Sequence, residues 1–202
     1  MKFIDLGLPT GTKWANMNIG ATSETDYGLY FQWGDTVGYA GDEALNHSTW
    51  LTCPGNGGNE DYDVTSITVW DKEHLTSGIL KTDVDAAYVH TNGKAKMPTR
   101  AQYQELLDET DHSWVTDYNG TGINGMKFVN KTDSSKYIFI PASGNAWDGS
   151  FYNVGDYGSL WSSSVYTSGA QLASGLYFHS DSYGVFSSYR SSGHCVRGVV
   201  NA

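Results

Sequence analysis

One glycine-rich run has the spacing of a dinucleotide-binding motif. Residues 120–125 read Gly-Thr-Gly-Ile-Asn-Gly and match G-x-G-x-x-G. In dinucleotide-binding folds this run follows a buried strand and opens a helix, so that its backbone amides cradle a pyrophosphate. Here it follows Asp-Tyr-Asn and leads into a strand-like apolar run. We therefore expect a surface loop at this position and no bound cofactor.

The last third of the chain holds the residue types of a hydrolase. A serine nucleophile needs an adjacent base and a third group that orients the base. His179, Asp181 and His194 lie there among many serines, but G-x-S-x-G is absent and no spacing singles out one serine. The sequence thus predicts no catalytic residue, and we expect a protein that is not an enzyme.

Metal-binding patterns are also missing. The six histidines form no H-x-H or H-x-x-x-H pair, which argues against zinc. Residues 59–63 (NEDYD) offer oxygen ligands but lack the order of a calcium loop. Cys53 and Cys195 are far apart in sequence and are expected to be two ordinary thiols, although pairing between them stays open. No metal site is expected.

The charge balance restricts the partners. The chain has 12 basic and 22 acidic residues, for a net charge of −10. Nucleic acids and anionic membrane surfaces bind through Lys and Arg, so both are disfavoured. No apolar run approaches the roughly 18 residues of a membrane span, and we expect no membrane insertion.

A stretch near the C-terminus has an unusual composition. Residues 173–195 (ASGLYFHSDSYGVFSSYRSSGHC) are rich in Ser, Tyr, Gly and His. Tyrosine gives large, stiff contact area and Ser and Gly give adaptable hydrogen bonding, as in antibody paratopes. Lys, Glu, Gln, Trp and Met make up 30 of the 202 residues, yet this stretch contains none of them. The composition indicates a binding surface.

Local patterns predict the elements that would position this surface. Pro98, the capping residue Thr99 and Gln102 predict a helix over 100–108, with Tyr103, Leu106 and Leu107 as its buried stripe. A short helix is expected near 85–90. Runs at 126–129 and 137–140 predict a hairpin. Residues 41–68 are polar and irregular and are expected to form a surface insertion in a single domain of 1–202.

Nine segments along the chain carry a family resemblance. They are residues 4–15 (IDLGLPTGTKWA), 18–21 (NIGA), 27–35 (YGLYFQWGD), 85–87 (DAA), 97–99 (MPT) with 105–107 (ELL), 139–144 (FIPASG), 160–164 (LWSSS) and 195–199 (CVRGV). In this order they resemble the Fibrobacter-type major paralogous domain of gut Bacteroidetes and their phages. Two positions depart from that family, which often has proline at Gly198 and serine at Cys195.

The resemblance implies a fold and a mode of action. It implies an α+β, C-type-lectin-like fold with short helices and a small antiparallel sheet. That fold is shared with retroelement variable proteins and with formylglycine-generating enzymes. Adenine-specific mutagenesis by a diversity-generating retroelement cannot turn an asparagine codon into Lys, Glu, Gln, Trp or Met, the types missing from residues 173–195. The calcium-lectin triplets E-P-N, Q-P-D and W-N-D are absent, so the fold does not imply sugar binding.

We therefore expect a non-catalytic binding protein with a variable ligand-binding region around 160–197. The expected framework comprises Trp161, Leu176, Phe178, Val185, Arg190, Val196 and Arg197. The expected ligand-contacting residues are Tyr166, Tyr177, His179, Asp181, Ser182, Phe186, Ser187, Ser188, Tyr189, Ser191, Ser192 and His194. Alternation along the strand predicts Tyr177 and His179 on the face opposite Leu176 and Phe178.

The first choice of function is a phage receptor-binding protein at a tail-fibre tip, trimeric in that setting, with a protein or glycan receptor on a bacterial cell. The lack of a leader-like pattern in residues 1–7 fits a virion protein. The alternative is a cell-surface or secreted bacterial adhesin whose leader was removed. An enzyme of the formylglycine-generating type is a distant third.

Overall fold

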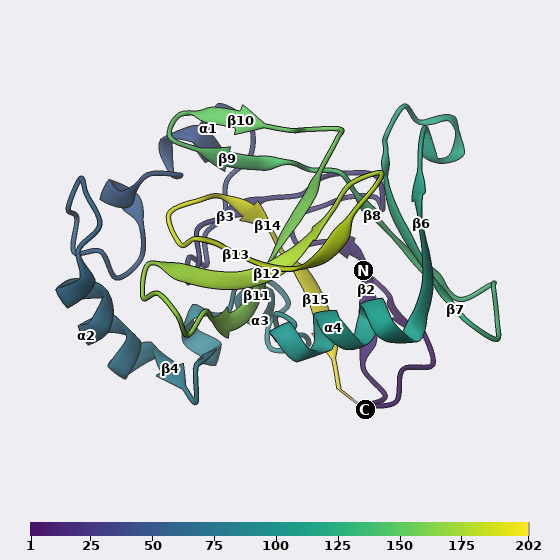
Figure 1. Ribbon diagram of the computed structural model, residues 1–202, viewed down its shortest axis with the longest axis horizontal. Coiled ribbons are helices and arrows are strands. Elements are labelled where there is room, and N and C mark those ends of the chain that lie inside the picture. Colours follow the sequence, from purple (N-terminus) through teal and green to yellow (C-terminus); the bar gives the residue numbers. More distant parts are fainter. Residues whose placement is uncertain (202) are drawn as a thin grey trace.

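The computed structural model describes residues 1–201, which form a mixed α+β architecture of several sheets and short helices (Figure 1). Four α-helices are present in these residues: α1 (Asp42–Asn46), α2 (Val64–His74), α3 (Ala86–His90) and α4 (Arg100–Glu109). These residues also contain three short 3₁₀ turns: η1 (Trp50–Thr52), η2 (Thr82–Val84) and η3 (Tyr118–Gly120). None of the helices in the described part of the chain has the length and apolar character needed to cross a membrane.

The largest sheet carries most of the C-terminal third. Its main path runs in the order β13 (Tyr183–Tyr189), β12 (Leu172–Phe178), β11 (Gly158–Val165), β14 (His194–Cys195) and β3 (Tyr30–Phe31). Two short strands, β4 (Leu75–Thr76) and β5 (Ile79–Leu80), join it at β11. The sheet is larger than the expected small antiparallel one, and β11 pairs with β14 in parallel.

Two further sheets and a hairpin surround it. One sheet has the order β1 (Phe3–Asp5), β2 (Lys13–Asn18), β15 (Arg197–Val200). The other consists of β6 (Thr110–Val115), β7 (Gly125–Asn130) and β8 (Tyr137–Pro141), and so contains the predicted hairpin. β9 (Asn145–Trp147) and β10 (Ser150–Tyr152) form a separate hairpin at the top of Figure 1. The glycine run at 120–125 is the loop leading into β7, as predicted.

Helix α4 forms for the reasons that its sequence predicts. Thr99 accepts a hydrogen bond from the backbone N–H of Gln102 at 3.2 Å, and the Gln102 side chain accepts one from the Thr99 N–H at 2.9 Å. This capping box satisfies two amides of the first turn. Tyr103, Leu106 and Leu107 are buried against β11, β12 and β13, so α4 covers one face of the large sheet (Figure 1).

The expected framework residues are buried, with one exception. Trp161, Leu176, Phe178, Arg190, Val196 and Arg197 are each fully buried. Val185 is only half-buried, because β13 lies at the edge of the sheet.

The segment 41–68 differs from the expected irregular insertion. It contains α1, η1 and the first turn of α2. Asp63 caps that helix, and its carboxylate accepts a hydrogen bond from Thr65 N–H at 2.9 Å. Asn56 is fully buried and donates to the carbonyls of Trp50, Asn59 and Asp61. These bonds give the segment a fixed shape despite its polar composition.

Helix α2 is anchored next to the end of β13 by an ion pair between its Asp71 and the buried Arg190. The Arg190 guanidinium is fully buried and makes two bonds to the Asp71 carboxylate, at 2.6 and 3.0 Å. It also lies 4.5 Å from the Trp33 ring, which packs on Trp70 of α2.

The two cysteines are separate. Cys53, in the segment 41–68, and Cys195 are both buried, and neither forms a disulfide. Burial raises the pKa of both thiols to about 12.

Candidate ligand-binding surface

The β12–β13 hairpin presents one side to the core that contains Leu176 and Phe178, while its other side is partly exposed and becomes buried towards Ala173, in a second cluster with Trp161. All seven residues of β13 oppose the seven of β12 without a register shift. Because side chains alternate along a strand, Leu176 and Phe178 point into the core, where both are fully buried. Tyr177 and His179 lie on the opposite side and are half-buried. The predicted alternation is confirmed.

Two aromatic rings on this outer side each pack over a glycine of the neighbouring strand. Gly175 is opposite Phe186, and a Cβ at Gly175 would come within 2.6 Å of the Phe186 ring. Gly184 is opposite Tyr177, and a Cβ there would come within 3.2 Å of the Tyr177 ring. The centroids of the two rings are 5.9 Å apart in a T-shaped arrangement. The glycines thus allow a compact aromatic platform.

Polar groups surround the platform. The Tyr177 and Ser182 hydroxyls are 2.9 Å apart and share a hydrogen bond. The His179 ring lies 4.6 Å from the ring of Tyr157, and its Nδ1 accepts a hydrogen bond from the Asp181 backbone N–H at 3.3 Å. Asp181 itself is exposed at the hairpin turn. The arrangement offers stacking and hydrogen bonding, with one carboxylate at its margin.

His194 supports the platform from beneath. Its ring makes T-shaped contacts with Trp161 at 4.3 Å and with Phe186 at 5.6 Å. Its Nε2 lies 3.0 Å from the Ser188 hydroxyl, and its Nδ1 has no partner among the described residues. Burial lowers the pKa of His194 to about 3. At neutral pH this imidazole therefore cannot act as an effective base for Ser188.

For three of the expected ligand-contacting residues the predicted exposure is wrong. Ser191, Ser192 and His194 are buried, with relative exposures of 0%, 4% and 2%. The chain turns inward at Arg190, whose carbonyl accepts a hydrogen bond from Trp33 N–H at 3.0 Å, and returns as β14 between β11 and β3. Their polar side chains therefore lie inside the protein and cannot contact a ligand on this surface.

The other expected residues are spread over three places. Tyr177, His179, Ser182, Phe186 and Ser188 come together at the platform, and Asp181 lies at the adjacent turn. Ser187 is opposite the fully buried Ser174 and so belongs to the inner side of the hairpin. Tyr189 is 47% exposed at the far end of β13, and Tyr166 is half-buried in the nearby β11–β12 connection.

Sequence reasoning missed several aromatic residues around the surface. The Tyr157 ring is tilted against that of His179, with centroids 4.6 Å apart, and Trp50 lies 6.0 Å from Tyr189. Trp147 and Tyr152 are about 40% exposed on the β9–β10 hairpin. In the sequence these residues form a cluster of aromatic residues among turn residues at 147–157, which lies outside the Ser- and Tyr-rich residues 173–195.

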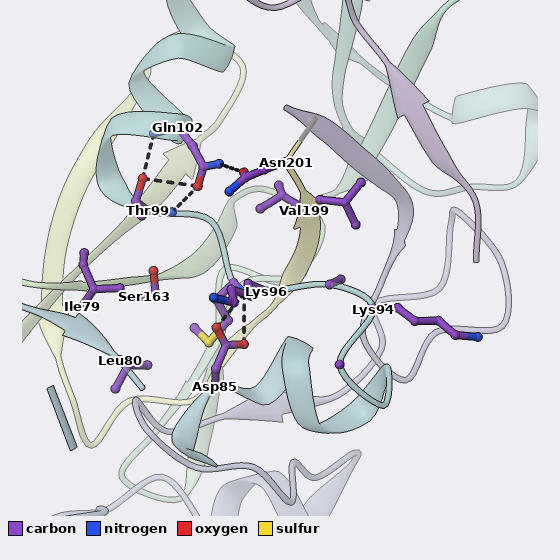
Figure 2. A pocket seen from close by; sticks show the side chains of 14 residues that line it. Ile79, Leu80, Asp85, Lys94, Lys96, Thr99, Gln102, Ser163, Val199 and Asn201 are labelled. Carbon is purple, nitrogen blue, oxygen red and sulfur yellow. Dashed lines mark hydrogen bonds between the residues drawn. The ribbon is translucent and has the colours of Figure 1, made fainter. Parts of the chain in front are cut away.

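A cavity of about 390 Å³ lies elsewhere, between β5, β11, residues 93–99 and the C-terminal strand (Figure 2). Its buried acid, Asp85, accepts bonds from the N–H groups of Tyr88 at 2.9 Å and Met97 at 3.0 Å. Burial raises the pKa of Asp85, and these bonds oppose the shift. Asp85 therefore caps α3, and its side chain already has partners. Lys94 and Lys96 at the rim are exposed.

Comparisons of the chain with known protein families, with characterised proteins and with solved structures find no match. Within residues 1–201, no group of three or more His, Cys, Asp or Glu side chains is arranged to hold a metal ion.

Proposed function

We propose that the chain has a C-type-lectin-like fold and acts as a non-catalytic binding protein, with the β12–β13 platform as its ligand-contacting surface. The observation that carries this proposal is the pair of rings, Tyr177 and Phe186, each packed over a glycine of the facing strand, with the Ser182 hydroxyl bonded to that of Tyr177. Rigid aromatic area beside small polar groups gives contact energy at low conformational cost. A ligand would find this surface already formed.

The setting that we propose is the receptor-binding tip of a phage tail fibre, with a receptor on a bacterial cell. Two sequence features support it: the family resemblance along the chain, and the absence from residues 173–195 of the residue types that adenine mutagenesis cannot produce. A retroelement would vary the outer side of the hairpin, while volume constraints preserve the buried side beneath it.

The test uses fluorescently labelled protein and intact cells of a panel of bacteria, read by flow cytometry. Replacing Tyr177, Phe186 and Tyr189 by alanine is expected to lower binding at least about tenfold, since central aromatic anchors dominate interfaces. The matched control replaces Val37 and Val89, which are 59% and 41% exposed in other loops and helices, and should bind as the parent does.

Two of the three rings are half-buried, so the triple variant needs a fold control. Circular dichroism and a melting curve report whether it folds. The pair Tyr177→Phe and Ser182→Ala keeps the ring over Gly184 and removes the two hydroxyls bonded to each other beside it, and it should also weaken binding. Parent-like binding by folded variants, or binding of the parent to none of the cells, would show that this surface is not a cell receptor site.

A further inference from the structure

Strand β13 leaves one side of its backbone without a partner strand. It ends the large sheet, with β12 beside it in the sheet and α4 on its inner face, and the His112 ring of β6 lies 4.2 Å from the ring of Tyr183. The ladder bonds with β12 are flanked by His179 N–H to Ser182 O at 2.8 Å and Arg190 N–H to Gln171 O at 3.0 Å. Since hydrogen-bonded pairs alternate in an antiparallel ladder, the N–H and C=O groups of Tyr183, Val185 and Ser187 point away from β12.

This edge lacks the features that usually prevent strands from pairing with one another. Residues 182–189 contain no charged residue and no proline, and the β12–β13 ladder has no bulge. Other edges are different. β3 has only two residues, and Tyr39 bridges its Tyr30 on the outer side. β6 carries Asp111, an exposed acid. β13 is therefore a long, regular and uncharged edge.

The two tyrosines of this edge are placed symmetrically about Phe186. Tyr183 and Tyr189 stand three positions before and after it, and Val185 and Ser187 are its direct neighbours. If two copies pair antiparallel around Phe186, Val185 faces Ser187 of the second copy and Tyr183 faces Tyr189. The two Phe186 residues then face each other. The nearest charged residues, Asp181 and Arg190, lie outside the paired segment, so no like charges are opposed.

We propose that two copies of this chain associate through β13, which pairs with itself antiparallel about a two-fold axis at Phe186 and extends the sheet across both copies. The interface is isologous, since the same strand serves both sides. Edge pairing buries less area than a standard interface, so the dimer is weak, with a dissociation constant in the roughly micromolar range. Each copy carries a net charge of −10, so added salt strengthens the association.

Association is measured on the unliganded protein by sedimentation velocity across a concentration series, so the result does not depend on the proposed function. The parent chain is expected to double its mass as concentration rises. Ser187→Pro removes an outward N–H while leaving the ladder to β12 intact, and it should weaken association at least about tenfold. Ser187→Thr keeps that N–H and should dimerise as the parent does.

Cross-linking tests the register and does not need the proline variant to fold. In the proposed pairing the two residues at position 186 face each other within disulfide distance, so Phe186→Cys should form a covalent dimer on mild oxidation. The control Ser188→Cys places its two thiols about 13 Å apart along the strands and should stay uncrosslinked. The native thiols are buried.

A chain that stays monomeric at a protein concentration about 100 times the expected micromolar dissociation constant would overturn the proposal. So would an oligomer that is unchanged by folded Ser187→Pro, or one in which Phe186→Cys fails to cross-link.

Discussion

Stability below neutral pH should depend on His194. The imidazole is 2% exposed, it contacts Trp161 and Phe186, and burial lowers its pKa to about 3 from the usual 6.5. In the unfolded chain the same ring takes up a proton at a pH near 6.5. Below that pH the unfolded state binds one more proton than the folded state, and folding becomes less favourable as the pH falls towards 3.

The size of this effect follows from the two pKa values. Each pH unit between 6.5 and 3 costs about 1.4 kcal/mol of unfolding free energy. Between pH 7.5 and pH 4.5 the loss attributable to His194 is therefore about 3 kcal/mol. A small domain has only about 5–15 kcal/mol in total, so the loss is large enough to measure.

Urea unfolding of the parent and of His194→Phe at pH 7.5 and 4.5 isolates this contribution. Phenylalanine keeps a flat ring between Trp161 and Phe186 and cannot take a proton. All other titrating groups are common to both proteins, so their effects cancel in the difference. The parent should lose about 3 kcal/mol more than the variant over this pH range. A difference below about 1 kcal/mol would refute the reasoning, because it would mean that the ring is accessible to water in the folded protein.

Three substitutions test the packing at the two platform glycines and at the Asp71–Arg190 ion pair. Gly175→Ala would place a Cβ 2.3 Å from the Leu160 carbonyl oxygen and should cost about 1–3 kcal/mol in urea unfolding. Gly184→Ala meets only a ring edge, at 3.2 Å, and should change stability by less than about 0.5 kcal/mol; equal effects of the two variants would contradict the packing. Asp71→Ala leaves the Arg190 guanidinium buried without a counter-charge and should lower the free energy of unfolding by about 3 kcal/mol. A loss typical of exposed pairs, under about 1 kcal/mol, would show that this ion pair does not anchor α2.

The sequence predicted elements whose signals are local. Thr99 and Gln102 specify the start of α4, and the period-two pattern from Leu176 specifies which side of β12 is buried. Both signals arise within a few residues of chain, where capping and alternation decide the outcome. The capping box and the alternation are found as predicted.

The missed features depend on contacts between distant residues. Helix α2 contains the β-branched residues Val64, Thr65, Ile67 and Thr68, which favour a strand by propensity, and its ion pair joins positions 119 residues apart. Ser191 and Ser192 are of a residue type that is common on solvent-exposed surfaces. They are buried because the chain crosses into the sheet after Arg190, and no local pattern reports that crossing.

The placement of rings over glycines has a consequence for how this surface can change. Where Phe186 covers Gly175, the bare backbone of β12 lies directly beneath the ring. Exchanging Phe186 for serine would remove the ring and leave a furrow along the strand, because glycine has no side chain to fill the space. The same applies to Tyr177 over Gly184. Substitutions at positions 177 and 186 can thus replace the raised aromatic surface by a groove while the backbone keeps its position. The hairpin can therefore vary the shape of its surface as well as its chemistry.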